Sequence, residues 1–354
     1  MSWILAFLGF ASLVILHEAG HFFAAKAVGM RVERFALFFP PLVYKIRRGE
    51  TEYGIGAIPL GGYVKITGMN PAEEIPPEHA HRAYYRQPVW KRIVVIAAGP
   101  FVNIVLAFVI LAGVFMSQGT VEPPPVVGKI DAGSPAASTL KQGDVVLAVD
   151  GKPLTGNYTA QLDQVQKAVG AHKGTPVSMT VRRNGTEQTV SGKTFYDKVN
   201  KRYRFGFAYD PDASSRSAGP LRASHLAVEE MWTVTSSTVS HIAQIFVPEK
   251  RKELGSVVGG YEQTRQAFSI SASTALVILA FISLSLGVIN LFPFLPLDGG
   301  HIFWALAEKV RGRAIPFSIM ERAGFIGFAL VIALFLVGFT NDLDRLANGG
   351  FRLR

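Results

Sequence analysis

The chain has 354 residues, a net charge of +10 at neutral pH and 49% hydrophobic residues. Its mean hydropathy of +0.27 is high for a soluble globular protein and natural for a membrane protein that also has an aqueous part. The sequence contains no cysteine, which excludes a disulfide framework, thiolate catalysis and metal sites built from thiolates.

Four apolar segments are long enough to cross a lipid bilayer, which takes about 20 mainly apolar residues. A signal peptide is the alternative for the first of them, but such a peptide needs a basic region before its apolar run. Here the first basic residue, Lys26, follows that run. The four predicted spans are Trp3–Val28, Arg92–Met116, Ser273–Phe292 and Ala323–Phe339.

Basic residues gather in the loop between the first two spans and in the loop between the last two. Because Lys and Arg in short loops mark the cytoplasmic side, we expect both loops in the cytoplasm and residues 117 to about 270 outside it. The excess positive charge therefore has a topological explanation, and no nucleic-acid partner is expected. The residues concerned are Arg31, Arg34, Lys45, Arg47, Arg48, Lys65, Arg82, Arg86, Lys91, Arg92, Lys309, Arg311, Arg313 and Arg322.

The long outer stretch contains a small α+β module at about 121–210. After a proline-rich linker, NYTAQLDQVQKAV has helical spacing of apolar residues, and PVSMTVRRNGTEQTVSG predicts a hairpin with its turn at Asn184–Gly185. The run GSPAA…LxxGDVVLAVDG resembles bacterial PDZ domains, which bind extended peptides, often C-termini, by strand addition. A spacer domain without a ligand is the alternative.

Two other segments lie outside the spans. Leu221–Phe246 has apolar residues at helical spacing, which suits a helix lying along the outer membrane surface and equally a plainly packed helix. The segment 31–67 is rich in β-branched and aromatic residues punctuated by Gly and Pro, which predicts β-hairpins. It is more apolar than a cytoplasmic loop needs, so we expect it at the bilayer margin, with its backbone paired internally.

The first span, in the stretch LVILHEAGHFFAAKAVG, carries two histidines and a glutamate. His17 and His21 are four residues apart and therefore share one helix face. H-E-x-x-H is typical of zinc peptidases, in which both imidazoles bind Zn²⁺ and the glutamate, here Glu18, is the general base. A polar cluster satisfied by other helices is the alternative. At a rise of about 1.5 Å per residue, His17 lies inside the roughly 30 Å hydrocarbon core, past its midplane.

A catalytic zinc normally takes three protein ligands and keeps one position for water. The third span ends in NLFPFLPLDGGHIFWAL, where prolines and glycines break the helix. This span runs in the same direction as the first, so its far end reaches a similar depth. Asp298 is the expected third ligand, and His301 is its competitor.

In the second span, AAGPFVNI places Gly99 and Asn103 four residues apart on one face. Small residues permit close helix approach, so Asn103 is expected to hydrogen-bond across the bundle. A packing motif without a catalytic role is the alternative.

Together these motifs resemble one family. HEAGH (17–21), GPFVN (99–103) and NLFPFLPLDGGH (290–301), with a PDZ-like module between the second and third spans, resemble the site-2 proteases, which are intramembrane zinc metalloproteases. AIPLGGYVKITG (57–68) is similar to the β-loop of their bacterial regulator of sigma-E protease branch. The resemblance implies a polytopic α-helical membrane protein with about four transmembrane helices, a membrane-associated β-hairpin loop and an inserted extracytoplasmic PDZ-like α+β domain.

Pattern and resemblance divide the chain into four regions. Residues 1–120 are the expected N-terminal half of the protease core, including the β-loop at 31–67, and 121–210 the PDZ-like domain. Residues 211–267 are an amphipathic helix and linker region at the outer membrane surface. Residues 268–354 are the C-terminal half of the core.

The resemblance also carries roles onto single residues. It makes Glu18 the catalytic glutamate and His17, His21 and Asp298 the Zn²⁺ ligands. The substrate-binding residues that it implies are Asn290, Asn103, Gly61, Gly62 and Tyr63.

The implied activity is that of a metalloendopeptidase cleaving in or near transmembrane segments. Implied partners are single-span membrane proteins such as pre-trimmed anti-sigma factors, peptide C-termini at the PDZ-like module, and the lipid bilayer. The implied location is the bacterial plasma membrane, with the active site toward the cytoplasm.

Two other functions fit parts of the sequence. A membrane-anchored PDZ peptide-binding protein would hold a structural metal, which usually takes four protein ligands, so His301 would have to join the other three. A cation transporter would need several intramembrane acidic residues, and the spans offer little beyond Glu18 and Asp298.

Overall fold

The computed structural model describes residues 1–347 except 71–72, 119, 122–123, 157, 198–201, 211–214, 217, 245–246, 248–250, 252–253 and 314. Its described residues form two compact units. The helical unit comprises Met1–Val114 and Ser224–Arg354, and the αβ unit comprises Phe115–Ala223.

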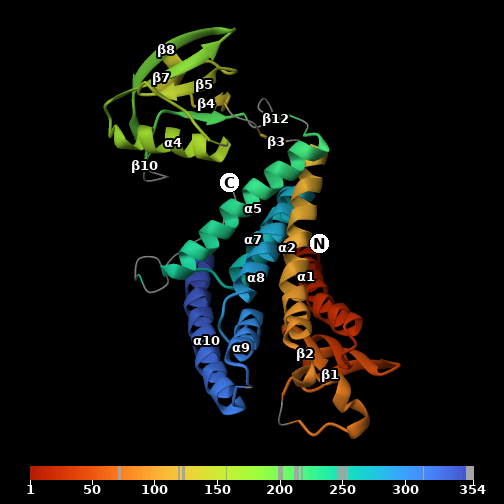
Figure 1. The fold of residues 1–354 in the computed structure, drawn as a ribbon. Coiled ribbons are helices and arrows are strands. Elements are labelled where there is room, and N and C mark those ends of the chain that lie inside the picture. The colour runs from red at the N-terminus through yellow and green to blue at the C-terminus, as the bar shows by residue number, and fades with distance from the viewer. Residues whose placement is uncertain are drawn as a thin grey trace. The chain divides into compact units, whose positions relative to one another are not determined.

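Long helices make up most of the helical unit (Figure 1). Helices α1, α7 and α8 pack against one another, and α10 packs against α7. The helices are α1 Ser2–Ala27, α2 Val89–Gln118, α5 Pro220–Ala243, α7 Val257–Ile270, α8 Ala272–Asn290, α9 Asp298–Arg311 and α10 Phe317–Ala347, with 3₁₀ turns η1 Pro77–Arg82 and η2 Tyr84–Arg86. The last two residues of the helix predicted at Leu221–Phe246 lie outside the described residues.

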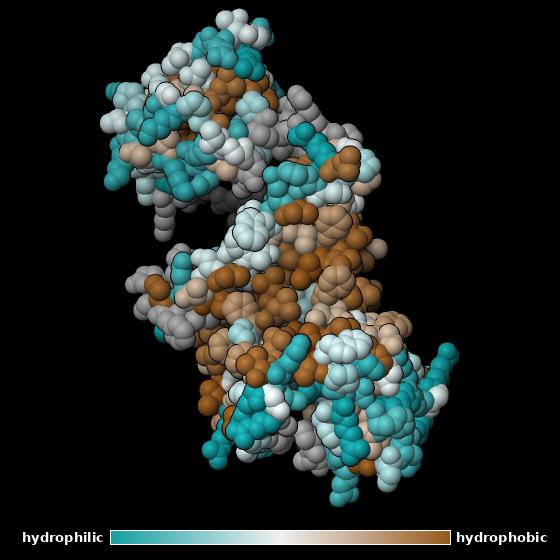
Figure 2. All heavy atoms as spheres, viewed as in Figure 1, coloured by the Kyte–Doolittle hydropathy of each residue, from teal (hydrophilic) through white to brown (hydrophobic). Residues whose placement is uncertain are grey.

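Four helices in the described part of the chain are long and apolar enough to cross a membrane, and they confirm the four predicted spans. They are α1, α2, α8 and Ser318–Ala347 of α10. The fourth helix is longer than predicted because it continues at both ends beyond the apolar run, over residues 317–322 and 340–347. Large apolar side chains such as Phe101 and Phe325 are exposed, and Figure 2 shows apolar residues gathered on one face over the middle of the helical unit, with hydrophilic residues at its ends, as expected of helices that cross a bilayer.

Small residues allow the backbones of three of these helices to approach closely. A Cβ atom added at Gly20 of α1 would lie 2.6 Å from the carbonyl oxygen of Ala98 in α2. One added at Gly287 of α8 would lie 2.9 Å from the carbonyl oxygen of Pro100. Close approach of this kind brings α1 and α8 to the same part of α2.

Between α1 and α2 the chain forms a β-hairpin of two long, bent strands, β1 Val32–Arg48 and β2 Thr51–Ile66. The pairing is antiparallel, and each strand contributes two segments to it: residues 34–37 pair with both 52–55 and 62–65, while 44–48 pair with 51–55. The two strands therefore form a sheet of four adjacent segments, in the order 62–65, 34–37, 52–55 and 44–48. Each segment is called a run below. Run 62–65 has a strand partner on one side only, within the described residues.

The αβ unit is built on a four-stranded sheet of order β6-β5-β7-β8. Its buried core includes Val146, Val177, Val181 and Phe205. The predicted hairpin is confirmed: Asn184 and Gly185 both have positive φ, 51° and 83°, as a type I′ turn requires. The elements are β3 Thr120–Val121, β4 Val127–Ile130, α3 Pro135–Thr139, β5 Val145–Val149, β6 Lys152–Pro153, α4 Tyr158–Ala171, β7 Pro176–Arg183, β8 Thr186–Lys193, β9 Phe195–Asp197, β10 Arg202–Arg204, β11 Phe207–Tyr209 and β12 Ser215–Arg216.

Candidate metal centre

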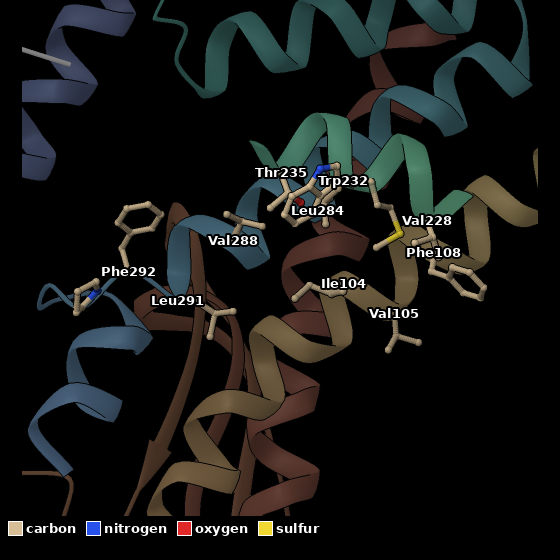
Figure 3. Close-up of a pocket in the computed structure, with 12 residues that line it drawn as sticks. Ile104, Val105, Phe108, Val228, Trp232, Thr235, Leu284, Val288, Leu291 and Phe292 are labelled. Carbon is tan, nitrogen blue, oxygen red and sulfur yellow. The ribbon is translucent and has the colours of Figure 1, made fainter. Parts of the chain in front are cut away.

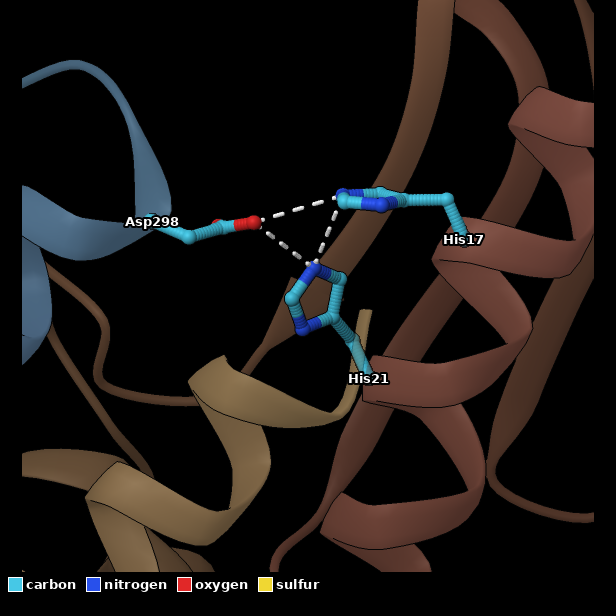
Figure 4. A group of neighbouring side chains, drawn as sticks. All are labelled: His17, His21 and Asp298. Atoms are coloured by element: carbon cyan, nitrogen blue, oxygen red, sulfur yellow. Dashed lines mark hydrogen bonds and ion pairs between the residues drawn. The ribbon is translucent and has the colours of Figure 1, made fainter. Parts of the chain in front are cut away.

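Three predicted ligands from two distant parts of the sequence converge in the helical unit (Figure 4). His17 and His21 come from successive turns of α1, and Asp298 is the first residue of α9. Oδ2 of Asp298 lies 3.3 Å from Nε2 of His17 and 3.4 Å from Nε2 of His21. The two Nε2 atoms are 3.3 Å apart, so the three atoms form a nearly equilateral triangle.

This triangle has the size that a tetrahedral zinc site requires. Zinc binds nitrogen and oxygen at about 2.0–2.1 Å, so two ligand atoms of a tetrahedron are about 3.3–3.4 Å apart by the same geometry. Both histidines are buried, and Oδ2 of Asp298 has no hydrogen-bond partner among the described residues. A cation bound by all three atoms satisfies them together, and the donor set fits Zn²⁺.

Helix α2 orients one of the two histidines. Nδ1 of His21 lies 2.9 Å from the carbonyl oxygen of Val95 and donates to it. Gly99, one turn further along α2, faces the same ring: an added Cβ atom would overlap Nε2 of His21. Helix α2 thus contributes to the site. The sequence could not indicate this role of Val95, because its main-chain carbonyl and not its side chain makes the contact.

Glu18 lies between the centre and the hairpin. Its carboxylate interacts electrostatically with His17, His21 and Asp298. A Cβ atom added at Gly62 of β2 would overlap Cγ of Glu18 and lie 3.0 Å from its Oε1. The predicted catalytic glutamate therefore packs directly against the one-sided run 62–65 of the hairpin.

The other residues predicted to bind substrate lie at two places. The ring centroid of Tyr63 is 5.9 Å from that of Phe39 in β1, and an added Cβ atom at Gly61 would lie 3.4 Å from the same phenyl ring. Asn290 is the last residue of α8, eight positions before Asp298.

The cross-bundle hydrogen bond expected of the Asn103 side chain is not formed. Asn103 is fully buried, and neither its amide nitrogen nor its amide oxygen has a partner among the described residues. Its main-chain carbonyl makes the contact instead, accepting from Oγ of Ser283 at 3.0 Å. The span pattern correctly placed Asn103 on an inward face, but it could not show which of its atoms meets α8.

His301 is not part of the ligand cluster. It lines a separate cavity of about 190 Å³ beside α9, together with Tyr84, Arg92 and Glu308. The fourth protein ligand that a structural zinc site would need is thus not supplied by His301 in this structure.

An apolar groove of about 750 Å³ adjoins the segment between α8 and α9 (Figure 3). Its walls come from α2, α5 and α8, and it ends at the residues that follow Asn290. The lining residues are Ile104, Val105, Phe108, Val228, Met231, Trp232, Thr235, Leu284, Val288, Leu291, Phe292 and Pro293.

The αβ unit has a cavity of its own. It measures about 330 Å³ and lies between α4, at Val165 and Val169, and the segment 202–209. The segment 202–209 includes strand β11, which pairs with β4. The cavity is therefore a groove between a helix and a strand.

The spans, the hairpin and the triangle of candidate ligands together fit a membrane protein of the metallopeptidase class. Residues 5–334 match the model of Peptidase family M50. The chain belongs to this family, the site-2 proteases, and is a metalloprotease.

Two curated relatives match along nearly their whole length. A Clostridium perfringens protein whose name assigns it to the zinc metalloproteases is 32% identical, over 96% of this chain and 98% of its own. The zinc metalloprotease Rip1 of Mycobacterium tuberculosis is 29% identical, over 93% of this chain and 94% of its own. A solved PDZ domain from Listeria monocytogenes is 18% identical over 26% of this chain and 93% of its own, with a TM-score of 0.22, and at that score the likeness says nothing further about the fold.

Proposed function

We propose that this chain hydrolyses peptide bonds in or beside transmembrane segments of membrane proteins, at a zinc centre held by His17, His21 and Asp298. The observation that carries the proposal is the ligand triangle with 3.3–3.4 Å edges, built partly by a helix that is apolar enough to cross a membrane. Zn²⁺ held by these residues would lower the pKa of a bound water toward about 7 and would polarise the scissile carbonyl group.

In this proposal Glu18 performs the proton transfers. It takes a proton from the attacking water as the oxygen bonds to the scissile carbonyl carbon, and delivers a proton to the leaving nitrogen as the carbon–nitrogen bond breaks. Its contact with Gly62 keeps the carboxylate beside the backbone of β2. The absence of a side chain at Gly62 lets a strand come this close.

The hairpin supplies a surface on which substrate can be extended. Peptide bonds inside a helix are shielded, so a substrate must unwind, and its freed N–H and C=O groups then need partners in a membrane. Run 62–65 has an unpaired side among the described residues, and it is the run that touches Glu18. Substrate adds to it as a further strand, while Asn290 contributes side-chain hydrogen bonds.

The apolar groove accepts the part of the substrate that remains helical. Its walls are formed by apolar side chains almost throughout, and it ends at Leu291–Pro293, between Asn290 and Asp298. A transmembrane segment lying there would lead directly to the metal centre. That continuity favours a substrate segment as the occupant.

The orientation and partners follow from charge and from the αβ unit. Basic residues between α1 and α2 and between α8 and α10 favour a cytoplasmic position for these connecting segments and an extracytoplasmic one for the αβ unit, in a bacterial plasma membrane. The groove beside α4 suits an extended peptide C-terminus. Substrates would be single-span proteins such as anti-sigma factors, trimmed first by another protease in regulated intramembrane proteolysis.

Co-expression with candidate single-span membrane proteins tests the proposal, comparing wild type with Glu18→Gln. The expected result is a shortened product with wild type only, while both purified proteins contain zinc. A metal-free wild-type protein, or equal cleavage by Glu18→Gln, would refute it.

A further inference from the structure

Helix α9 carries the candidate ligand Asp298, so contacts that fix the position of α9 also fix that of the ligand. Its first turn lies against the preceding loop, where a Cβ atom added at Gly300 would be 2.5 Å from the nitrogen of Leu295. Ile302 packs on an apolar cluster that includes Val95 and Ile96 of α2. A cavity of about 190 Å³ lies on the flank of α9.

An ion pair links the far part of α9 directionally to α2. Arg92, in the first turns of α2, donates from Nη1 to Oε2 of Glu308 at 3.0 Å and from Nη2 to Oε1 at 2.7 Å. Arg92 is only 8% exposed, and its guanidinium carbon lies 6.0 Å from the ring centroid of Tyr84. A planar two-point contact of this kind fixes both distance and orientation, which a single charge contact does not.

The same stretch of α2 also contacts the other half of the metal centre. Arg92 and Val95 are three residues apart and therefore lie within one helical turn. Val95 accepts the hydrogen bond of His21 from α1, while Arg92 holds α9. One turn of α2 thus contacts the two elements that must meet to form the ligand triangle.

We propose that Arg92 and Glu308 are a positioning pair that sets α9 against α2 and so holds Asp298 at the distance that His17 and His21 require. The inference rests on the proposed metal centre. Glu308 lies ten residues, or about 15 Å along a rigid helix, from Asp298. Sliding or rotation of α9 is therefore transmitted to the ligand. Metal–ligand distances tolerate only about 0.2 Å, so a small displacement weakens binding.

Zinc affinity, measured by competition with a chromophoric chelator on the full-length protein in detergent, tests the inference independently of proteolysis. Glu308→Gln removes the carboxylate charge, and Arg92→Lys keeps the positive charge while losing the two-point contact. Both variants should bind zinc about 10- to 100-fold more weakly than wild type, the usual effect of losing a group that orients a metal ligand.

Glu50→Gln is the matched control. Glu50 also accepts a two-point contact, from Arg82 at 2.6 and 2.9 Å, but it lies on the hairpin and does not touch α9. It should lower the melting temperature of the metal-free protein without changing zinc affinity. Arg92→Lys is the second test variant because Glu308→Gln leaves the buried charge of Arg92 unpaired and can unfold the protein.

Three outcomes are distinguishable. Weaker zinc binding by a variant that stays folded without metal, with wild-type affinity in Glu50→Gln, supports the positioning role. Wild-type affinity in folded Arg92→Lys and Glu308→Gln overturns it. Failure of the wild type itself to bind zinc would instead refute the metal centre, and with it the proposed function.

Discussion

His21 donates from Nδ1 to the main-chain carbonyl of Val95 over 2.9 Å. Because a carbonyl only accepts, Nδ1 carries the proton, and in the neutral ring Nε2 keeps its lone pair for a metal. Nε2 is the atom that faces His17 and Asp298. A main-chain group of α2 thus selects the tautomer that metal binding needs, as groups next to a ligand commonly do.

Gly99→Ala should disturb this arrangement. The new Cβ atom would overlap Nε2 of His21, so the ring must move and zinc affinity should fall about tenfold or more. Alanine favours a helix over glycine by about 1 kcal/mol, so helix propensity alone predicts a more stable α2 and no loss of zinc affinity. Gly113→Ala on the same helix, which meets no atom within 4 Å, is the control. Equal zinc affinity in both variants would contradict the prediction.

Gly62→Ala should impair catalysis while leaving the metal in place. The Cβ atom of the new alanine would overlap Cγ of Glu18. Glu18 is not one of the three candidate metal ligands. Because general acid–base groups contribute about 10²–10⁴-fold, displacing the carboxylate should lower kcat by about 100-fold. Zinc content, measured by metal analysis of the purified protein, should match that of wild type. Loss of zinc would mean that the hairpin supports the ligands rather than Glu18.

Local patterns sufficed to predict the spans and the three side chains that the structure brings together. Spans are apolar runs, and His17 and His21 share a helix face by spacing alone. Asp298 could be predicted to lie near the two histidines because it follows the helix break at Pro293–Pro296, at the end of a span that runs in the same direction as the first.

Contacts between segments distant in sequence could not be predicted in this way. The approach of Gly62 to Glu18 depends on how two bent strands pair. Arg92 looks like a charge at the end of a span, and only the structure pairs it with Glu308 across 216 positions. Asn103 shows the same limit. Helical spacing predicts that it shares a face with Gly99, but it does not predict that the main-chain carbonyl, and not the side chain, bonds to Ser283.

Acid should weaken the link between the hairpin and its neighbours. Hydrogen bonds from Arg82, together with one from Lys26 and against the effect of partial burial, lower the pKa of Glu50 from 4.5 to about 2. Since the folded pKa is the lower one, the stabilisation is complete above about pH 4.5 and is lost as the pH falls toward 2.

The melting temperature of Glu50→Gln, compared with that of wild type, measures this contribution. The variant should melt lower at pH 6, and the difference between the two proteins should shrink steadily at pH 4 and pH 3. A difference that does not change with pH would show that the Glu50 charge is irrelevant to stability.

Filling the apolar groove should block substrate without affecting the metal. Val288→Trp places a large ring between α2, α5 and α8, so a transmembrane substrate should bind less well. If the groove contributes ground-state binding, KM should rise about tenfold with kcat nearly unchanged, and zinc content should stay the same. Leu276→Trp, at an exposed site on the same helix that is outside the groove, should behave as wild type.

Removal of the PDZ-like region tests whether it selects substrates by size. If residues 121–210 exclude proteins with bulky outer domains, replacing them with a short Gly–Ser linker should allow cleavage of untrimmed substrates, which wild type leaves intact. Trimmed substrates should be cleaved by both proteins. Gln166→Trp, which places a large ring at an exposed position that lines the groove beside α4, separates peptide capture from size exclusion: it should weaken binding of a C-terminal peptide while untrimmed substrates stay excluded. A deletion variant that remains selective would contradict the filter, because selection would then reside in the helical unit.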